Sequence, residues 1–122
     1  FLINIRATYV IAGPDQLLYE SLGEPRLYKP VYYTVTKAGV LGLTKYIATY
    51  YQGTEIRCNA LTPGGVERDH EPAFKEAYGK RAVMGRMAYP HEMKGAVVFL
   101  ASDASSYMTG ANLVVDGGWT AW

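Results

Sequence analysis

The chain has 122 residues, 49% of them hydrophobic and 19% charged, and its formal net charge is +1. These values suit one small globular domain with a single core, and they exclude a disordered chain and a dedicated nucleic-acid surface. No apolar run is long enough to cross a membrane and no signal-peptide pattern precedes the first strand, so with a single cysteine, Cys58, we expect a cytoplasmic protein without a disulfide.

The first predicted element is a strand at Phe1–Ile5, a short apolar run of the kind that is buried in a parallel sheet. It leads into a long loop from Gly13 to Pro30, whose Gly, Pro and Asp residues favour turns. Functional residues are often carried on loops, so we expect this loop to form a wall or lid over a substrate.

A helix is predicted from Pro30 to Gln52, because the stretch holds no internal proline and Gly53 follows its last apolar residues. On this helix Tyr33 and Lys37 lie one turn apart and face the same side. An ammonium close to a phenol favours the phenolate, so the pair is suited to giving and taking a proton. Taken alone, the same spacing also fits an ordinary pair of side chains on a solvated surface.

The second half of the chain predicts two strands separated by helices. The strand Glu55–Leu61 runs into the turn Thr62–Val66, at the end of a sheet where ligands bind in doubly wound folds. A short amphipathic helix at Phe74–Tyr78, a longer helix at Tyr89–Ala101 and a strand at Asn112–Asp116 complete the pattern. We therefore predict an α/β fold, a partial Rossmann-like, doubly wound parallel sheet with about three strands, two long helices and one short helix.

Two histidines and two tryptophans are further candidates. His70 and His91 lie apart in the sequence and have no cysteine at ligand spacing, so no metal site is predicted. Trp119 and Trp122 lie at the end of the chain, where we expect them to anchor an interface rather than to be buried within the chain.

The pair Tyr33-x-x-x-Lys37 is followed by I-R-C-N-A-L-T-P-G-G-V at Ile56–Val66 and by a segment, Gly85–Gly118, that ends in N-L-V-V-D-G-G. This order, over most of the chain, resembles the C-terminal half of the short-chain dehydrogenase/reductase family. The resemblance implies an oxidoreductase that transfers a hydride between NAD or NADP and a small-molecule carbonyl or alcohol substrate.

The resemblance also implies roles for individual residues. Tyr33 would donate or accept the proton, and Lys37 would promote that exchange and bind the nicotinamide ribose hydroxyls. The amide group of the nicotinamide would lie against the backbone of the turn after the second strand, at Pro63, Gly64 and Val66.

The sequence departs from the family pattern in two places. Arg6 and Ala7 stand where the family has two serines, the second of them catalytic, and Ser21 in the long loop is a candidate replacement. No glycine-rich segment precedes a helix to hold the cofactor's pyrophosphate, and the family's catalytic asparagine lies in the same missing half. Residues 1–122 are therefore predicted to be the C-terminal half of such a domain, inactive in isolation. The long loop also resembles that of bacterial family members acting on sugars.

An alternative hypothesis is a non-catalytic oligomerisation module that keeps the family's subunit-packing surfaces. The strand Phe1–Ile5 would lack one neighbour and form an open edge, and the Tyr33 helix is apolar around more of its circumference than one small sheet covers. Both hypotheses predict a homo-oligomer or association with the missing N-terminal half.

Overall fold

Three parallel strands form the centre of the molecule, of which the computed structural model describes residues 1–20 and 28–122. The strands are β1 (Leu2–Ile5), β2 (Cys58–Pro63) and β3 (Asn112–Val115). They are hydrogen-bonded in the order β1-β2-β3, and both pairs are parallel, with Asn4 opposite Ala60 in the first. The predicted α/β fold with a parallel, Rossmann-like sheet is confirmed.

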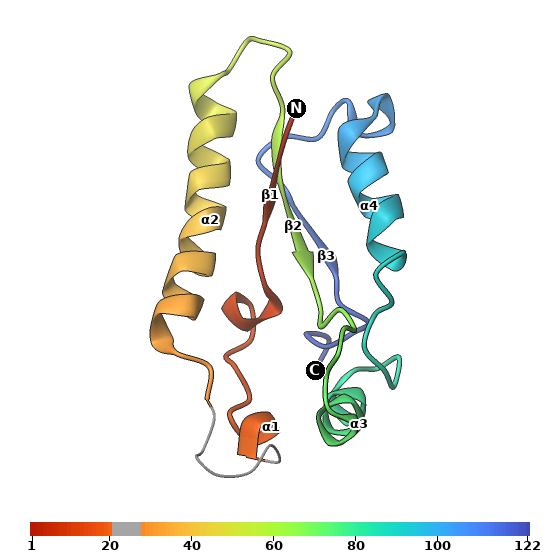
Figure 1. The fold of residues 1–122 in the computed structure, drawn as a ribbon. Coiled ribbons are helices and arrows are strands. Elements are labelled where there is room, and N and C mark those ends of the chain that lie inside the picture. Colours follow the sequence, from red (N-terminus) through yellow and green to blue (C-terminus); the bar gives the residue numbers. More distant parts are fainter. Residues whose placement is uncertain (21–27) are drawn as a thin grey trace.

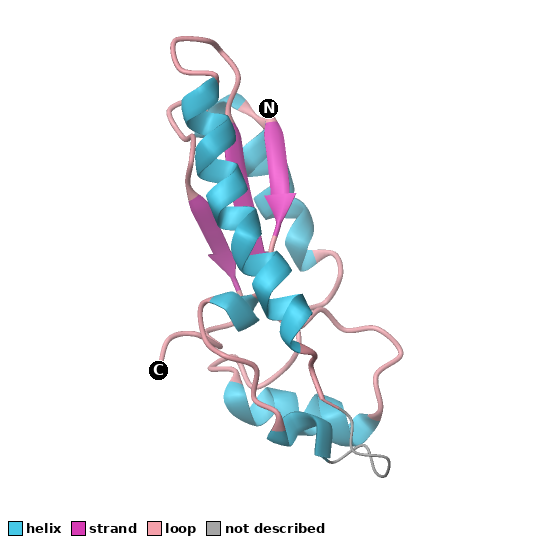
Figure 2. Cartoon of the chain, turned by 90° about the vertical axis from the view of Figure 1, so that its left-hand side faces the viewer, coloured by secondary structure: helices cyan, strands magenta, loops and turns pink. Residues whose placement is uncertain are grey.

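Helices cover both faces of this sheet. Helix α2 (Val31–Tyr50) packs on one face and α4 (Glu92–Ala101) on the other, as Figures 1 and 2 show from two directions. The shorter helical elements are η1 (Thr8–Val10), α1 (Leu17–Glu20), α3 (Pro72–Arg81) and η2 (Asp103–Ser105). Of these, α1 and α3 lie beyond the carboxyl ends of the strands (Figure 1). None of the described helices is both long enough and apolar enough to span a membrane.

The long helix α2 begins and ends within two residues of its predicted bounds. Pro30 lies just before the helix rather than in its first turn, and its carbonyl accepts the amide of Tyr33 at 3.1 Å. At the other end Gly53 has a φ of +74°, a left-handed conformation that glycine adopts without steric cost. The predicted role of Gly53 in ending the helix is therefore confirmed.

Strand β2 lies further along the chain than predicted. Its pairing with β1 begins at Cys58, and its pairing with β3 continues to Pro63, so the predicted bounds Glu55–Leu61 are wrong at both ends. Cys58, Ala60 and Thr62 are fully buried, as expected for a central strand covered on both faces. The cysteine is free, and its thiol is enclosed within the sheet.

Helices α3 and α4 also differ from their predicted bounds. The short helix predicted at Phe74–Tyr78 extends in both directions, to Pro72–Arg81. Helix α4 begins at Glu92 rather than Tyr89, because the Glu92 carboxylate accepts the Tyr89 amide at 2.7 Å and closes a turn there. The guanidinium of Arg86 binds the same carboxylate at 2.7 and 2.8 Å and fixes this turn.

The prediction that Trp119 is exposed for an interface is wrong. Its indole is 4% exposed and stacks on Tyr78, with ring centroids 4.2 Å apart. It belongs to a buried cluster beyond the carboxyl end of the sheet, formed by Tyr9, Leu18, Phe74, Tyr78, Ala82, Met87 and Trp119. Trp122, by contrast, is 78% exposed.

A turn after β3 explains why Trp119 is buried. Gly117 and Gly118 have φ values of +64° and +81°, which reverse the direction of the chain. The Asp116 carboxylate accepts the amides of Gly118 and Thr120 at 2.9 and 3.0 Å and so fixes the reversal. The indole is therefore directed back under the sheet rather than away from it.

Candidate functional site

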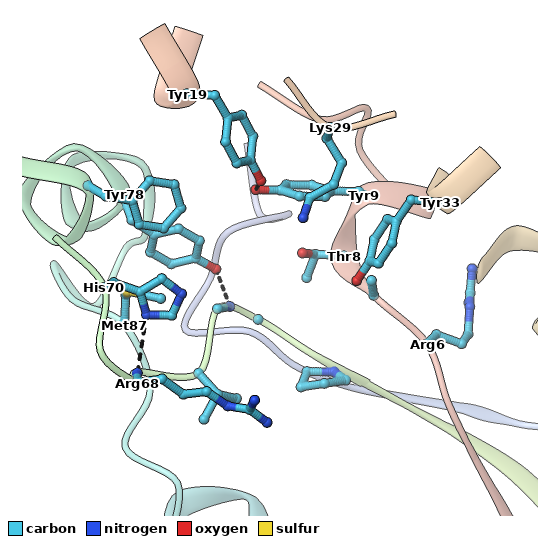
Figure 3. A pocket seen from close by; sticks show the side chains of 16 residues that line it. Arg6, Thr8, Tyr9, Tyr19, Lys29, Tyr33, Arg68, His70, Tyr78 and Met87 are labelled. Atoms are coloured by element: carbon cyan, nitrogen blue, oxygen red, sulfur yellow. Dashed lines mark hydrogen bonds between the residues drawn. The ribbon is translucent and has the colours of Figure 1, made fainter. Parts of the chain in front are cut away.

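A cavity of about 440 Å³ opens at the carboxyl ends of β1 and β2 (Figure 3). This is the end of a doubly wound sheet where ligands bind, and the volume lies within the usual range of roughly 300–1,000 Å³ for small-molecule sites. The residues that line it are Arg6, Ala7, Thr8, Tyr9, Tyr19, Lys29, Tyr33, Pro63, Gly64, Gly65, Val66, Arg68, His70, Phe74, Tyr78 and Met87.

Four of the five residues predicted to bind the cofactor line this cavity, namely Tyr33, Pro63, Gly64 and Val66. The fifth, Lys37, is outside the lining. Its Nζ donates to the carbonyl oxygen of Ile5 at 3.2 Å, which ties α2 to the end of β1 one turn away from Tyr33. The structure thus brings together, across the cavity, the helix residue and the glycine turn that are distant in the sequence.

A second cation, which sequence reasoning missed, lies against Tyr33. The ammonium of Lys29 is 4.7 Å from the centre of the Tyr33 ring and 5.5 Å from that of Tyr19. The side-chain amide of Gln16 holds the backbone of Lys29, accepting its N–H at 2.9 Å and donating to its carbonyl at 3.2 Å. No local pattern signals this position, because it depends on a contact between the two ends of the long loop.

The end of β1 supplies a hydroxyl beside the position of the absent serine. Ala7 lines the cavity, as expected if it stands in the serine's place. Its neighbour Thr8 is 5% exposed, and Figure 3 shows its hydroxyl directed into the cavity on the same wall as that of Tyr33. Within the described part of the chain this hydroxyl has no hydrogen-bond partner. Ser21, the replacement suggested by the sequence, lies outside the described residues.

Three other tyrosines add hydroxyl groups to the lining. The hydroxyls of Tyr9 and Tyr19 are 3.0 Å apart, and that of Tyr78 accepts the backbone amide of Gly65. Burial raises the pKa of Tyr9, Tyr19 and Tyr78 above the ordinary value of a phenol. All three therefore stay protonated in neutral solution and present hydroxyls rather than negative charge.

The turn after β2 has no room for side chains. A Cβ on Gly64 would lie 2.8 Å from the Cα of Asp116, and one on Gly65 would lie 2.6 Å from the Tyr78 ring. The wall formed by residues 63–66 is therefore bare backbone at these glycines. Such a surface fits the flat amide-bearing ring of a nicotinamide, which can approach backbone groups closely.

The remaining polar residues of the lining are basic. Nδ1 of His70 accepts the backbone amide of Arg68 at 3.1 Å, so the neutral imidazole has its proton on Nε2. Arg6 is 5% exposed, its Nε has no hydrogen-bond partner among the described residues, and burial lowers its pKa. The described residues contain no group of three or more His, Cys, Asp or Glu side chains placed to hold a metal ion.

Comparison with known proteins gives consistent matches. A family model described as enoyl-(acyl carrier protein) reductase matches residues 21–120. The chain is 40% identical over 99 residues to a 2-keto-3-deoxy-L-fuconate dehydrogenase of Xanthomonas campestris, a match that covers 72% of this chain and 33% of the relative. It is 42% identical over 128 residues to a ribulose-forming D-arabinitol 2-dehydrogenase of Scheffersomyces stipitis, covering 98% of this chain and 44% of the relative.

A solved structure extends the likeness to the fold. The chain superposes on a short chain dehydrogenase from Leptospira borgpetersenii with bound NAD⁺ at a TM-score of 0.87 and 36% identity. This match covers 97% of the present chain and 43% of the other. The chain thus spans less than half the length of each of the three proteins.

Proposed function

The chain belongs to the short-chain dehydrogenase/reductase family, and on this premise we propose that it forms the catalytic part of an NAD- or NADP-dependent oxidoreductase. One observation carries the proposal: a single cavity at the carboxyl end of a parallel sheet is lined by Tyr33 and by the glycine turn Pro63–Val66. The names of the two relatives give 2-keto-3-deoxy-L-fuconate and D-arabinitol as substrates, so we propose a small sugar-derived carbonyl or alcohol as the substrate.

Tyr33 is the residue to which we assign proton transfer. When an alcohol carbon loses a hydride, its hydroxyl proton must pass to a base, and a carbonyl that gains a hydride must receive a proton. The Tyr33 hydroxyl is directed into the cavity, where it can serve in either direction (Figure 3). Lys37, held at the carbonyl of Ile5, is the residue we assign to the ribose hydroxyls of the cofactor.

Thr8 is the residue to which we assign the hydroxyl that Ala7 lacks. Of the described buried side-chain nitrogen and oxygen atoms only Arg6 Nε lacks a hydrogen-bond partner, so the Thr8 hydroxyl is open to the cavity, where a ligand can reach it. A substrate oxygen placed between Thr8 and Tyr33 would satisfy this hydroxyl and would be oriented for proton transfer. Thr8 is favoured because it follows Ala7 directly, at the start of η1, and lines the cavity.

A nicotinamide cofactor, when bound, supplies or accepts the hydride. The backbone of Pro63, Gly64 and Val66 would hold its amide end. No glycine-rich segment precedes a helix in these 122 residues, so we propose that the pyrophosphate is held by a further segment or partner. The 122-residue chain by itself should then bind NADH and NADPH more weakly than micromolar in calorimetry. Micromolar affinity for either would contradict the proposal that the pyrophosphate is held elsewhere.

The proposed role of Tyr33 is tested by Tyr33→Phe in the catalytically complete enzyme. Loss of a general acid–base group should lower kcat on the order of 10²- to 10⁴-fold, with cofactor affinity and unfolding unchanged. Tyr32→Phe is the matched control, because Tyr32 is the preceding helix residue, is 68% exposed and is outside the cavity lining. Turnover that is equal in the two variants would show that Tyr33 only packs in the site.

A non-catalytic oligomerisation module remains a second candidate, favoured by the outer surface of α2. This surface carries apolar side chains that are 50–78% exposed: Val31, Tyr32, Val35, Leu43, Tyr46 and Tyr50. A Cβ on Gly39 or Gly42 would meet nothing within 4 Å, which leaves room for the close approach of a partner helix. We propose a twofold contact here, and light scattering should give at least a dimer mass at micromolar concentration. A monomer mass would contradict it.

A further inference from the structure

The charges that line the cavity are all of one sign. Arg6, Lys29 and Arg68 line it, and no Asp or Glu of the described residues does. Three cationic side chains around one cavity create a positive potential, which attracts an anionic ligand and opposes the binding of a cation. A neutral substrate would gain nothing from this arrangement.

The carboxylates on neighbouring segments do not neutralise these cations. Three of them have a cationic partner outside the cavity lining: Glu67 with Lys75 (2.6 Å), Asp15 with Arg81 (3.1 Å) and Glu92 with Arg86 (2.7 Å). Asp116 instead accepts the amides of Gly118 and Thr120, and Asp69 is exposed and forms no ion pair with a described residue. Neither Lys29 nor Arg68 forms an ion pair within the described part of the chain. Their charges are thus left for a ligand.

Lys29 is held in position rather than mobile at the surface. The Gln16 amide binds both its backbone N–H and its carbonyl, and its ammonium rests over the rings of Tyr19 and Tyr33. A cation that is ordered before the ligand arrives loses less conformational entropy on binding. Because it lies 4.7 Å from the centre of the Tyr33 ring, an anion bound to it is adjacent to the proton-transfer group.

Hydroxyl groups surround this cation. Those of Thr8, Tyr9 and Tyr19 all belong to the lining, and Figure 3 shows them on the same side of the cavity as the Lys29 ammonium. Burial keeps the two phenols protonated, so they can both donate and accept hydrogen bonds. Such a wall suits a ligand that carries several hydroxyls of its own.

We propose that the substrate is a small polyhydroxylated carboxylic acid whose carboxylate is bound by Lys29 beside Tyr33. The inference rests on the proposed function and names the substrate class of the same site. Arg68 adds to the positive potential at the far wall, and the hydroxyls near Lys29 bind those of the ligand. A sugar alcohol of the same length would fit the cavity but would leave the ammonium unpaired.

Phosphate is a second source of negative charge, because the proposed cofactor contains a pyrophosphate. The test therefore includes inorganic pyrophosphate beside two six-carbon probes, gluconate and sorbitol, which differ in having a carboxylate or a terminal hydroxymethyl group. Binding of each to the 122-residue chain is measured by calorimetry at pH 7, with the ionic strength fixed by sodium chloride.

Four proteins are compared: the unmodified chain, Lys29→Gln, Lys29→Arg and Lys45→Gln. Lys45→Gln is the matched control, because Lys45 is an exposed residue of α2 outside the lining and its loss changes the net charge equally. We expect gluconate to bind at least about tenfold more tightly than sorbitol. Lys29→Gln should weaken the binding of gluconate roughly 10- to 100-fold and leave the affinity for sorbitol unchanged. Lys29→Arg and Lys45→Gln should retain the preference for gluconate over sorbitol.

Equal affinity for gluconate and sorbitol, a preference that survives Lys29→Gln, or no binding of either probe would overturn the inference. A loss of pyrophosphate rather than gluconate binding in Lys29→Gln would assign this lysine to the cofactor instead. The measurement needs neither cofactor nor turnover, so a failure of this inference can be told apart from a failure of the proposed function. If the complete enzyme turns over neutral polyols but not polyhydroxylated acids, and Tyr33→Phe abolishes that turnover, the proposed function stands and the substrate class is wrong.

Discussion

Trp119 supports the base of the cavity, and Trp119→Ala should therefore destabilise the whole chain. The indole stacks on Tyr78 at 4.2 Å with 22° between the ring planes, and it meets Tyr9 edge-on at 6.4 Å. Both tyrosines line the cavity. Removing the indole leaves a void behind them, so the substitution should affect both the core and the shape of the site.

The expected loss can be worked from these contacts. Truncating a buried Trp or Phe to Ala typically costs about 3–5 kcal/mol, of which an aromatic pair contributes about 0.5–1.5 kcal/mol beyond buried area. The Arg81 guanidinium, 5.7 Å from the indole, is exposed and adds little. We expect the free energy of unfolding to fall by about 4 kcal/mol, a large share of the 5–15 kcal/mol typical of a domain.

Trp122→Ala provides the control, because it removes the same side chain three positions later. Trp122 is 78% exposed, and its Nε1 donates a hydrogen bond to the carbonyl of Arg81 at 3.1 Å. Its loss should change the free energy of unfolding by about 0.5 kcal/mol or less. Urea unfolding followed by far-UV circular dichroism compares the two variants, and a difference between them below about 1 kcal/mol would refute the assignment of Trp119 to the core.

Two further substitutions test the site and its border. Thr8→Val should lower kcat/KM of the complete enzyme on the order of 10²-fold, and Thr8→Ser should retain most of the activity; steady-state kinetics that do not separate the two would show that the hydroxyl is unused. Hydrogen bonds from Arg86, and then from the Tyr89 amide, lower the pKa of Glu92 from 4.5 to about 2, so its contribution to stability is complete above pH 4.5 and is lost as the pH falls toward 2. Glu92→Gln should remove this part of the acid dependence in urea unfolding between pH 2 and 5, and an unchanged profile would contradict it.

The sequence predicts the kind of each main element correctly, but bounds depend on partners that a local pattern does not contain. β2 starts at Cys58 because β1 begins to pair there, and α4 starts at Glu92 because Arg86 and the Tyr89 amide close a turn on its carboxylate. The α2 helix is predicted best, since Pro30 and Gly53 are local signals at both ends.

The candidate site likewise contains residues that the sequence predicts and residues whose place depends on distant contacts. Tyr33 and the turn Pro63–Val66 could be placed together from sequence, because a helix start and a strand end meet at the carboxyl edge of a parallel sheet. Lys29 could not, since its place depends on the contact with Gln16. The family motif places the catalytic serine at Ala7, so it does not predict a role for Thr8. The sequence nevertheless contains a signal for it, because Thr8 supplies a hydroxyl directly beside the position where the serine is absent.

The open edge of the sheet gives a last prediction, because among residues 1–20 and 28–122 β1 pairs with a strand on one side only. The amides of Leu2 and Arg6 point toward β2 and bind the carbonyls of Arg57 and Leu61 at 2.8 and 2.9 Å. Alternate amides of a strand point to opposite sides, so those of residues 3 and 5 face the open edge. Hydrogen exchange of the isolated chain should therefore be fast at residues 3 and 5 and slow at residues 2 and 6.

The proposal that a further segment holds the cofactor's pyrophosphate implies that a further strand can complete the sheet. Addition of that segment should slow the exchange of the amides of residues 3 and 5 by at least about tenfold. Protection of these two amides in a chain that is monomeric by light scattering would mean that the edge is already covered, and the argument for a missing neighbour would fail.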